Sequence, residues 1–423
     1  MALQTSGQIS LKNIADEFGD TAPYSMSEYY GAASGIPASG IISIGNFYGA
    51  AAPINYQPIT SATSTIINTE YAGGDGAVMY DGTTLRYGQV TGILGNADFT
   101  MFNENGSLIN TILTNNGQIE ASFIAANDRY FLWATKRYRN SACMINIIDV
   151  NNNLIWNRSF TASTTINSID IGRQSVDRIA CRYQNSSTNY LKVYNTAGTL
   201  LKTTQFGNSG LYTTSVGDVV IGKDRIWVGS HGAYYLGYPG YPNNLSRIYE
   251  FDLNGNYIRY FNAPVNASQY DGFGGSMAYD WEEDLYYVHY RDLTNFSTYR
   301  GRIAIYNGSG TYLHSFTVPN NQMGYGENAA TVGRHKLISA SGGYIVVGGA
   351  NPFVYNQGRV WIYKITNGGT GNTLLYNITS PNAGSYTHFG MSVDSVHLSN
   401  GEHRVIATQE DVGNGNNSAY IWS

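Results

Sequence analysis

The sequence predicts an all-β chain built from repeated four-stranded units, and three observations lead to this prediction. Charged residues make up only 13% of the 423 residues, whereas the chain contains 49 glycines and 36 tyrosines. Tyrosine and threonine fit the pleated surface of strands, and glycine and asparagine accept the dihedral angles of tight turns. A strand–turn–strand pattern also recurs along the chain. Finally, the last unit lacks a strand that the N-terminal part of the chain can supply.

The recurring pattern is a hairpin, in which two β-rich runs flank a turn of small residues. The turns read ENG, NNN, TAG, NGN, GSG and the longer NGGTGN, and such residues are typical of hairpin turns. The hairpins are FTMFNENGSLINTI (99–112), MINIIDVNNNLIWNRSF (144–160), YLKVYNTAGTLLKTTQF (190–206), RIYEFDLNGNYIRYF (247–261), RIAIYNGSGTYLHSF (302–316) and RVWIYKITNGGTGNTLLYNI (359–378).

A second pair of strands is predicted between successive hairpins. Its inner member often opens with an aromatic residue and glycine or with Tyr-Thr, in YTTSVGDV (212–219), FGGSMAYD (273–280), YGENAATV (325–332) and FGMSVDSV (389–396). Its outer member is YFLWATKRY (130–138), RIACRYQ (178–184), RIWVGSHG (225–232), DLYYVHYRD (284–292), YIVVGGAN (344–351) and HRVIATQED (403–411). Four strands per unit are typical of β-propeller blades.

The two ends of the β-rich region give the number of blades. The seventh unit has strands at 386–396 and 403–409 and a last one at 418–423, so its fourth strand is missing. The strand-like run INYQPITSATSTIIN (54–68) has no partner in its own neighbourhood. We therefore predict a seven-bladed β-propeller over 54–423, in which the N-terminal strand completes the last blade. This closure removes an exposed sheet edge.

Two blades resemble the FG-GAP repeats of integrin-type propellers. The similarity is carried by GYIVVGGANPFVYNQGRVWIYKI and HFGMSVDSV, within 343–396. The calcium loop of that family, Asp-x-Asp-x-Asp-Gly, is missing. Alternating oxygen side chains do occur at Asp149–Asn151–Asn153 and Asp252–Asn254–Asn256, but without the glycine and the closing carboxylate that calcium loops use. We interpret both runs as hairpin turns, with calcium binding as the less favoured alternative.

Residues 1–53 follow another plan and are predicted to form a separate docking segment. Three stretches, SLKNIADEFG, SMSEYYG and SIGNFYG, each combine a serine, one or two helical turns, aromatic residues and a glycine. Ser25 and Glu28 fit a capping box. Such short helices are marginal alone, so we expect them to pack on the propeller or on another protein. The predicted docking residues are Leu11, Ile14, Phe18, Tyr29, Tyr30, Ile44, Phe47 and Tyr48.

The same segment resembles the N-terminal module of virion structural proteins of tailed, marine cyanophage-like bacteriophages. Three sub-motifs carry the resemblance in order: ISLKNIADEFG, PYSMSEYYGA and GIPASGIISIGNFYGA. Asn13 departs from the commoner aspartate, and Gly45–Asn46 replaces the usual Ser-Asp. The resemblance implies a particle component, present in several copies, in which this module attaches a variable C-terminal domain to other tail, baseplate or neck proteins.

The long connections between second and third strands are the predicted ligand-binding loops. In an up-and-down blade these connections share one face with the connections between blades, and loops on a rigid scaffold often carry function. Tyrosine supplies rigid contact area with a polar tip, suited to glycans or proteins. The alternative is that these aromatic side chains only cap the blade ends. The candidates are Tyr234, Tyr235, Tyr238, Tyr241, Asn295, Phe296, Tyr299, Arg300, Phe353 and Tyr355.

Catalysis, cofactors and metals have little support in the sequence. The acidic cluster Asp280, Glu282, Glu283 and Asp284 falls in a predicted turn between first and second strands, where a solvated turn is favoured over a glycosidase carboxylate pair. The seven histidines lack metal-ligand spacing. We expect no enzyme activity, no cofactor and no metal. Cys143 and Cys181 are expected to be reduced and packed.

Composition argues against two classes of partner. The net charge is −5 and the 24 lysines and arginines are scattered, so no basic stripe for nucleic acid is expected. No apolar run is long enough to span a membrane, and the N-terminus does not read as a signal peptide. A protein made in the host cytoplasm and located in the virion is the expectation.

Three functions remain open from the sequence. The favoured one is a tail-fibre or appendage protein whose propeller binds a host-surface glycan or protein non-covalently, with avidity from several copies. The second is a purely structural decoration or adaptor protein of the virion. The third and least favoured is a polysaccharide depolymerase. Fold alone cannot separate them, because function depends on sites.

Overall fold

The computed structural model describes most of the chain. The described residues are 8–18, 25–30, 36–37, 39–47, 65–69, 75–93, 96–114, 119–137, 143–160, 164–173, 175–185, 188–207, 217–230, 247–264, 273–292, 300–319, 336–349, 358–379, 387–411 and 417–422. The chain divides into two compact units, Met1–Gln57 and Pro58–Ser423. Within the described ranges, no helix is both long enough and apolar enough to cross a membrane.

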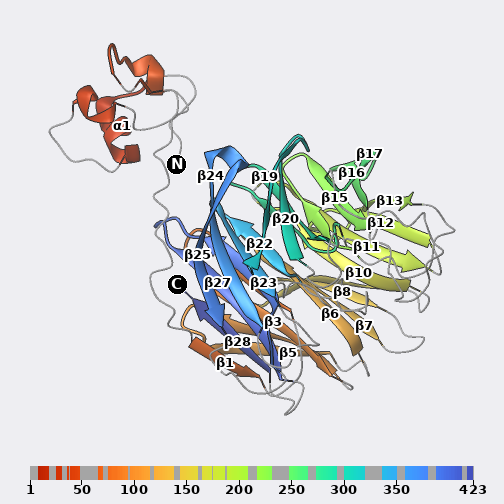
Figure 1. Cartoon of the computed structure of the whole chain (residues 1–423). Coiled ribbons are helices and arrows are strands. Elements are labelled where there is room, and N and C mark those ends of the chain that lie inside the picture. Colours follow the sequence, from red (N-terminus) through yellow and green to blue (C-terminus); the bar gives the residue numbers. More distant parts are fainter. Residues whose placement is uncertain are drawn as a thin grey trace. The chain divides into compact units, whose positions relative to one another are not determined.

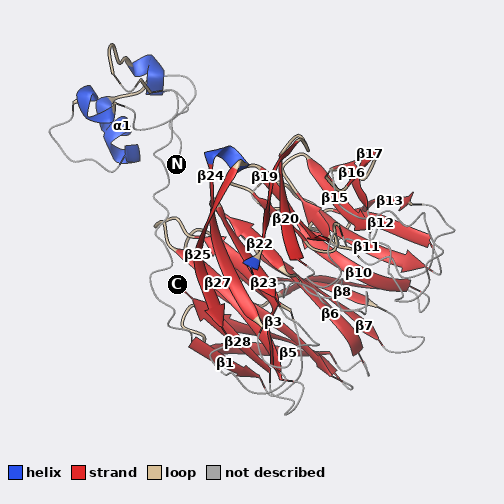
Figure 2. Ribbon diagram, in the orientation of Figure 1, coloured by secondary structure: helices blue, strands red, loops and turns tan. Residues whose placement is uncertain are grey.

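The second unit is a seven-bladed β-propeller, as the sequence predicts. It contains seven antiparallel four-stranded sheets, and the first strands of neighbouring sheets contact one another around the centre (Figure 1). Nearly all of its regular structure is strand (Figure 2). We number the blades one to seven in chain order and call the first, innermost strand of each blade its inner strand.

The strands of the first four blades follow one another along the chain. They are β2 (Gly76–Tyr80), β3 (Leu85–Ile93), β4 (Asn96–Asn103) and β5 (Leu108–Thr114); β6 (Ile119–Ala126), β7 (Tyr130–Arg137), β8 (Met144–Asp149) and β9 (Leu154–Ser159); β10 (Thr164–Ile171), β11 (Ile179–Asn185), β12 (Thr188–Tyr194) and β13 (Leu200–Phe206); β14 (Val219–Ile221), β15 (Arg225–Ser230), β16 (Arg247–Asp252) and β17 (Tyr257–Asn262).

The last three blades include the one that closes the ring. Their strands are β18 (Met277–Asp280), β19 (Leu285–Asp292), β20 (Arg300–Asn307) and β21 (Tyr312–Thr317); β22 (Ile338–Ser341), β23 (Tyr344–Gly349), β24 (Arg359–Thr366) and β25 (Gly371–Thr379), with the short helix η4 (Asn367–Gly369); and β26 (Thr387–His397), β27 (His403–Asp411), β28 (Asn417–Trp422) and β1 (Thr65–Thr69).

The two ends of the propeller pair, and this confirms the predicted closure. Strand β1 is the outermost strand of the seventh blade and runs antiparallel to β28, with Thr65 opposite Ile421 and Thr69 opposite Asn417 (Figure 1). The closing strand is shorter than the predicted run 54–68, whose residues 54–64 lie outside the described residues. Because β1 and β28 come from opposite ends of the domain, the ring cannot open without breaking this ladder.

Two predicted inner strands differ from those observed. The inner strand of the sixth blade is Ile338–Ser341, whereas the predicted run 325–332 lies outside the described residues. In the fourth blade only Val219 of the predicted run 212–219 belongs to β14, and 212–216 also lie outside the described residues. The aromatic–glycine and Tyr-Thr motifs misled these assignments, because the inner strands of both blades begin only after them. In the fifth blade as well, Phe273 and Gly274 come before β18 begins at Met277.

The aromatic–glycine motif instead marks a close contact between blades. Gly274 and Gly390 have φ angles of +83° and +80°, which L side chains rarely adopt. A Cβ atom on Gly229, in the preceding blade, would lie 1.9 Å from the carbonyl oxygen of Gly274. The same contact recurs between the sixth and seventh blades, where a Cβ on Gly348 would lie 2.1 Å from the Gly390 oxygen. Neighbouring blades therefore meet backbone to backbone at these points.

Apolar side chains fill the spaces between blades. One cluster joins the second and third blades and contains both cysteines, which are free and fully buried, as predicted. Burial raises the pKa of the Cys181 thiol, so it stays protonated at neutral pH. Trp133, Trp227, Trp361 and Trp422 are among the largest fully buried side chains and lie in four different blades.

The first unit has a small core of its own, and we call it the N-terminal module. It comprises α1 (Leu11–Phe18), η1 (Met26–Tyr29) and η2 (Ile44–Phe47). These turns pack against one another. That they also pack on the propeller or on another protein stays a prediction. The core residues are Ile9, Ile14, Tyr29, Ile36 and Phe47, with Leu11, Met26 and Ile42 packed against them.

Each helical turn of the module begins with the same serine cap. The predicted capping box is confirmed, because the backbone N–H of Ser25 donates to Glu28 at 3.0 Å and the Ser25 side chain accepts in return. Asparagine takes the glutamate's place in the other two turns. The N–H groups of Ser10 and Ser43 donate to Oδ1 of Asn13 and of Asn46, at 2.9 and 2.8 Å. These caps satisfy backbone donors that such short helices leave unpaired.

Candidate functional site in the central channel

The receptor-binding candidates lie almost entirely outside the described residues. This applies to Tyr234, Tyr235, Tyr238, Tyr241, Asn295, Phe296, Tyr299, Phe353 and Tyr355. Arg300 is the first residue of β20, and its backbone lies opposite Asp292. Their role as a binding surface therefore stays a prediction.

The strands that flank these candidates fix the face on which their loops emerge. Strand β15 ends at Ser230 and its partner β16 begins at Arg247, so 231–246 connects a second strand to a third one. The connections 293–299 and 350–358 have the same position in the next two blades. In contrast, the turns between third and fourth strands are short in the first five blades, for example 253–256. Because each sheet is an antiparallel meander, the longer connections share one face of the propeller.

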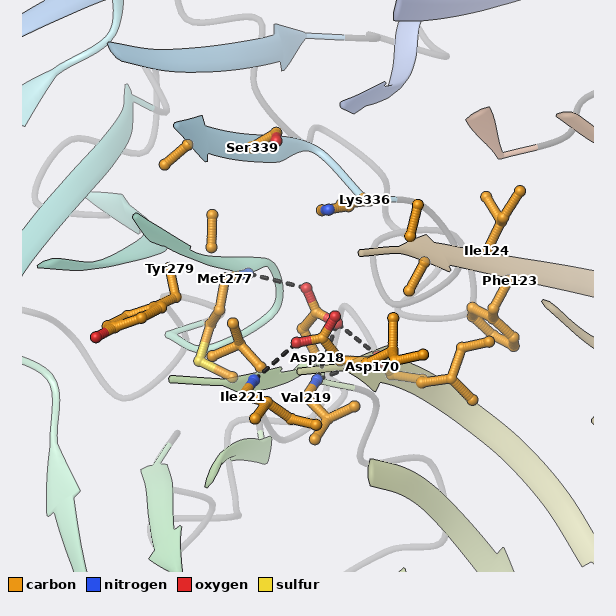
Figure 3. A pocket seen from close by; sticks show the side chains of 18 of the residues that line it. Phe123, Ile124, Asp170, Asp218, Val219, Ile221, Met277, Tyr279, Lys336 and Ser339 are labelled. Atoms are coloured by element: carbon orange, nitrogen blue, oxygen red, sulfur yellow. Dashed lines mark hydrogen bonds between the residues drawn. The ribbon is translucent and has the colours of Figure 1, made fainter. Parts of the chain in front are cut away.

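A small cavity lies in the channel that the inner strands surround. It is lined by residues of the first six blades and has a volume of about 50 Å³ (Figure 3). A buried water needs about 10–15 Å³ of such space, so the cavity has room for a few water molecules.

Serine and aspartate side chains at the inner strands connect most blades to the next. Oγ of Ser168 accepts from the N–H of Val219 at 3.1 Å, and Oδ2 of Asp170 accepts from the N–H of Ile221 at 2.7 Å. Both donors belong to the inner strand of the following blade. An inner strand has an edge without a strand partner, and these side chains satisfy its backbone donors.

The same arrangement repeats around most of the ring. It joins blades three to four, four to five, five to six, six to seven and seven to one. The further donor–acceptor pairs are Met277 N–H to Asp218, Leu337 N–H to Ser276, Gly343 N–H to Asp280, Ser395 N–H to Ser339, His397 N–H to Ser341, Gly76 N–H to Ser392 and Val78 N–H to Asp394, at 2.7–3.3 Å. We call this set the inter-blade serine–aspartate bonds.

An ion pair reinforces the bonds between the sixth, seventh and first blades. Nζ of Lys336 lies 2.9 Å from Oδ1 of Asp394, whose side chain is fully buried. The same carboxylate accepts from Oγ of Ser339 at 2.8 Å and from the N–H of Val78 at 2.9 Å. Burial alone would raise the pKa of Asp394, but the Lys336 and Arg173 cations hold it below its usual value. Asp394, in the seventh blade, is therefore ionised and contacts the sixth and first blades.

Two other carboxylates in the channel have a raised pKa, in contrast to the lowered pKa of Asp394. Figure 3 shows Asp170 and Asp218 beside each other at one wall of the cavity. Burial and the neighbouring Asp218 together raise the pKa of Asp170 to about 7, although Lys336 and the Ile221 amide act to lower it. Burial likewise raises the pKa of Asp218. A pair of carboxylates with a raised pKa can belong to an active site, but each of these already binds the backbone of an adjacent strand.

The raised pKa of Asp170 predicts a pH-dependent stability. The folded protein holds a proton on Asp170 up to about pH 7, whereas the unfolded chain releases it near pH 3.9. This contribution is fully present below the unfolded pKa and is lost as the pH rises through about 7, at about 1.4 kcal/mol per pH unit. The variant Asp170→Asn carries no such proton, so its free energy of unfolding should fall less steeply between pH 5 and 7. Urea unfolding at each pH measures this, and parallel curves for both proteins would contradict the prediction.

The acidic cluster lies in the predicted turn, but one member has a structural role. The turn 281–284 joins the first and second strands of the fifth blade, and Glu282, Glu283 and Asp284 are exposed. Asp280 is buried, which corrects the expectation of a fully solvated cluster. It accepts from the N–H groups of Gly342 and Gly343 in the next blade. Burial and the nearby Glu282 raise the pKa of Asp280 to about 8.

The alternating Asp/Asn runs are hairpin turns, as interpreted from the sequence. Oδ1 of Asp149 accepts from the N–H groups of Asn151 and Asn153 at 2.9 and 2.8 Å. Asp252 holds its own turn in the same way. These carboxylates are oriented by the turn itself. In the described part of the chain, no three His, Cys, Asp or Glu side chains are grouped so that they could hold a metal ion.

Sequence analysis missed the inter-blade serine–aspartate bonds. The signal was present as two Ser or Asp residues placed two or four positions apart, in SID (168–170), SMAYD (276–280), SAS (339–341) and SVD (392–394). Alternate residues of a strand point to the same side, so each run sends both polar side chains toward the next blade.

The comparisons with known proteins assign this chain to no family. No protein-family model matches the chain, and no curated protein sequence is similar to it. A Dos1 propeller structure shares 13% identity with a TM-score of 0.45, covering 84% of this chain and 93% of that one. The WD40 domain of Neurospora crassa Pan2 shares 8% identity with a TM-score of 0.48, covering 86% and 91%. The assignment of the fold therefore rests on the seven sheets and their closure by β1.

Proposed function

We propose that this chain is a structural component of a tailed-bacteriophage virion, in a tail fibre or another appendage. The N-terminal module attaches it to the particle, and the propeller presents its long-connection face to a host-surface glycan or protein. The observation that carries the proposal is the division into two compact units, each with its own core. A module that is folded in itself can attach different domains, which is what the sequence resemblance of residues 1–53 implies.

The properties of the propeller support a binding role rather than catalysis. Its channel carboxylates Asp170 and Asp218 already bind the backbone of neighbouring strands. Its longer connections emerge together on one face, and one of them contains four of the tyrosines predicted to bind a ligand. Adhesion through such loops needs no cofactor and gains strength from several copies on one particle.

The proposal is tested by binding of the purified full chain to host cells. The triple variant Tyr234→Ala, Tyr235→Ala, Tyr238→Ala should lose most of the binding. A matched control, Tyr257→Ala with Tyr312→Ala, removes tyrosines that are 49% and 44% exposed on outer strands and should bind normally. Equal binding of all three proteins would contradict the tyrosine-rich loop. No binding by any of them would favour a purely structural virion role, and release of reducing sugar would indicate a depolymerase.

A further inference from the structure

The N-terminal module exposes an apolar patch that its own core does not use. Ile41 is 91% exposed, Ile44 is 39% exposed and Tyr30 is 38% exposed. The hydroxyl of Tyr30 donates to the carbonyl oxygen of Gly40, which brings the tyrosine beside the residue that precedes Ile41. We call Tyr30, Ile41 and Ile44 the module patch.

The exposure of this patch is a property of the fold and not of a loosely packed segment. Ile42, directly after Ile41, packs against the core, and Phe47 at the end of η2 is fully buried. Tyr29, directly before Tyr30, is also buried and meets Phe47 edge to face, with 5.9 Å between ring centroids. Each exposed residue of the patch therefore sits close in sequence to a residue that anchors it. The patch is held in place before any partner arrives.

The charge of the module indicates what kind of surface it meets. Lys12 is the only basic residue among residues 1–57, while Asp16, Glu17, Asp20 and Glu28 are acidic, so the module is net negative. A second copy of the module would bring the same charge to the contact and would be repelled. A partner with basic side chains around an apolar recess complements both the negative charge of the module and the apolar surface of the patch.

We propose that the module patch inserts into an apolar recess, rimmed by basic side chains, on another protein of the particle. This inference rests on the proposed function and names the contact that it requires. Ile41 is the central residue, because a nearly fully exposed isoleucine has the most apolar surface to lose to a partner. Tyr30 and Ile44 flank it.

Purified full-length chain added to particles assembled without it tests this inference, with bound copies per particle as the readout. Ile41→Asp should reduce the affinity by about tenfold or more. Its thermal unfolding should match the parent chain, because Ile41 contributes little to the core. Leu108→Asp is the matched control: it places the same charge on an exposed leucine of the propeller, 62% exposed, and should bind as the parent does. Raising the salt concentration should weaken attachment of the parent chain, since it screens the opposite charges.

The outcomes separate this inference from the proposed function. If a chain lacking residues 1–57 still binds the particles, attachment does not use the module, and both ideas fail. If that truncated chain fails to bind but Ile41→Asp binds as the parent does, attachment by the module stands and the patch is overturned. Salt-independent attachment, or a patch that only drives self-association of the purified chain, would also overturn the proposed basic partner.

Discussion

Deleting residues 1–69 is expected to destabilise the propeller strongly and to make it aggregate. The deletion removes β1, whose five residues pair with β28. At about 1 kcal/mol for each net hydrogen bond, the lost ladder costs about 5 kcal/mol. It also leaves the edge of β28 unpaired, and such an edge can pair with another chain. Denaturant unfolding and size-exclusion chromatography at increasing concentration measure the two effects.

A shorter deletion provides the control for this experiment. A chain lacking only residues 1–57 loses the N-terminal module but keeps β1, so its propeller should unfold at the denaturant concentration of the full chain. The difference between the two truncations isolates the closing strand. Equal midpoints for both truncated chains would show that β1 does not hold the ring closed.

Replacing Asp394 with alanine is expected to destabilise the propeller by about 3–5 kcal/mol. The substitution leaves Lys336 without its anion and removes the acceptor of Val78 N–H and of the Ser339 hydroxyl. These groups lie in the sixth and first blades, so one change weakens two inter-blade contacts. Asp394→Asn keeps an oxygen acceptor and should cost less. Calorimetric or urea unfolding of the three proteins gives the comparison.

A half-buried ion pair in the same blade, whose carboxylate is open to solvent, serves as the matched control. Arg404 and Glu402 lie 2.7 Å apart, but their side chains are 23% and 44% exposed. Because solvent screens such a pair, Glu402→Ala should change the free energy of unfolding by less than about 1 kcal/mol. If Asp394→Ala were as mild as Glu402→Ala, the inter-blade serine–aspartate bonds would not be important for stability.

Acid should remove the contribution of Asp394 to stability, whereas it removes the cost of burying a charged Asp170. The lowered pKa of Asp394 means that its contribution is present above the unfolded pKa and is lost as the pH falls through the folded pKa. The raised pKa of Asp170 has the opposite consequence, because its contribution is present below the unfolded pKa and is lost as the pH rises through about 7. The two variants should therefore change the pH dependence of stability in different pH ranges.

The sequence by itself determined the class of fold, the number of blades and the closing strand. Hairpin turns repeat through short-range chemistry, since glycine and asparagine accept dihedral angles that other residues avoid. The capping box of Ser25 and Glu28 is equally local. A missing fourth strand at one end and an unpaired strand at the other could be matched by counting.

Only the tertiary structure decided which polar residues join the blades and which module residues face solvent. Asp394 and Val78 are neighbours although they are 316 residues apart in the chain. Ile41 and Ile42 are identical in type, yet one is exposed and the other packs on the core. Periodicity gives the side of a strand on which a residue lies, but burial depends on what the rest of the chain brings against it. That information is contained in the packing of distant segments and not in any local pattern.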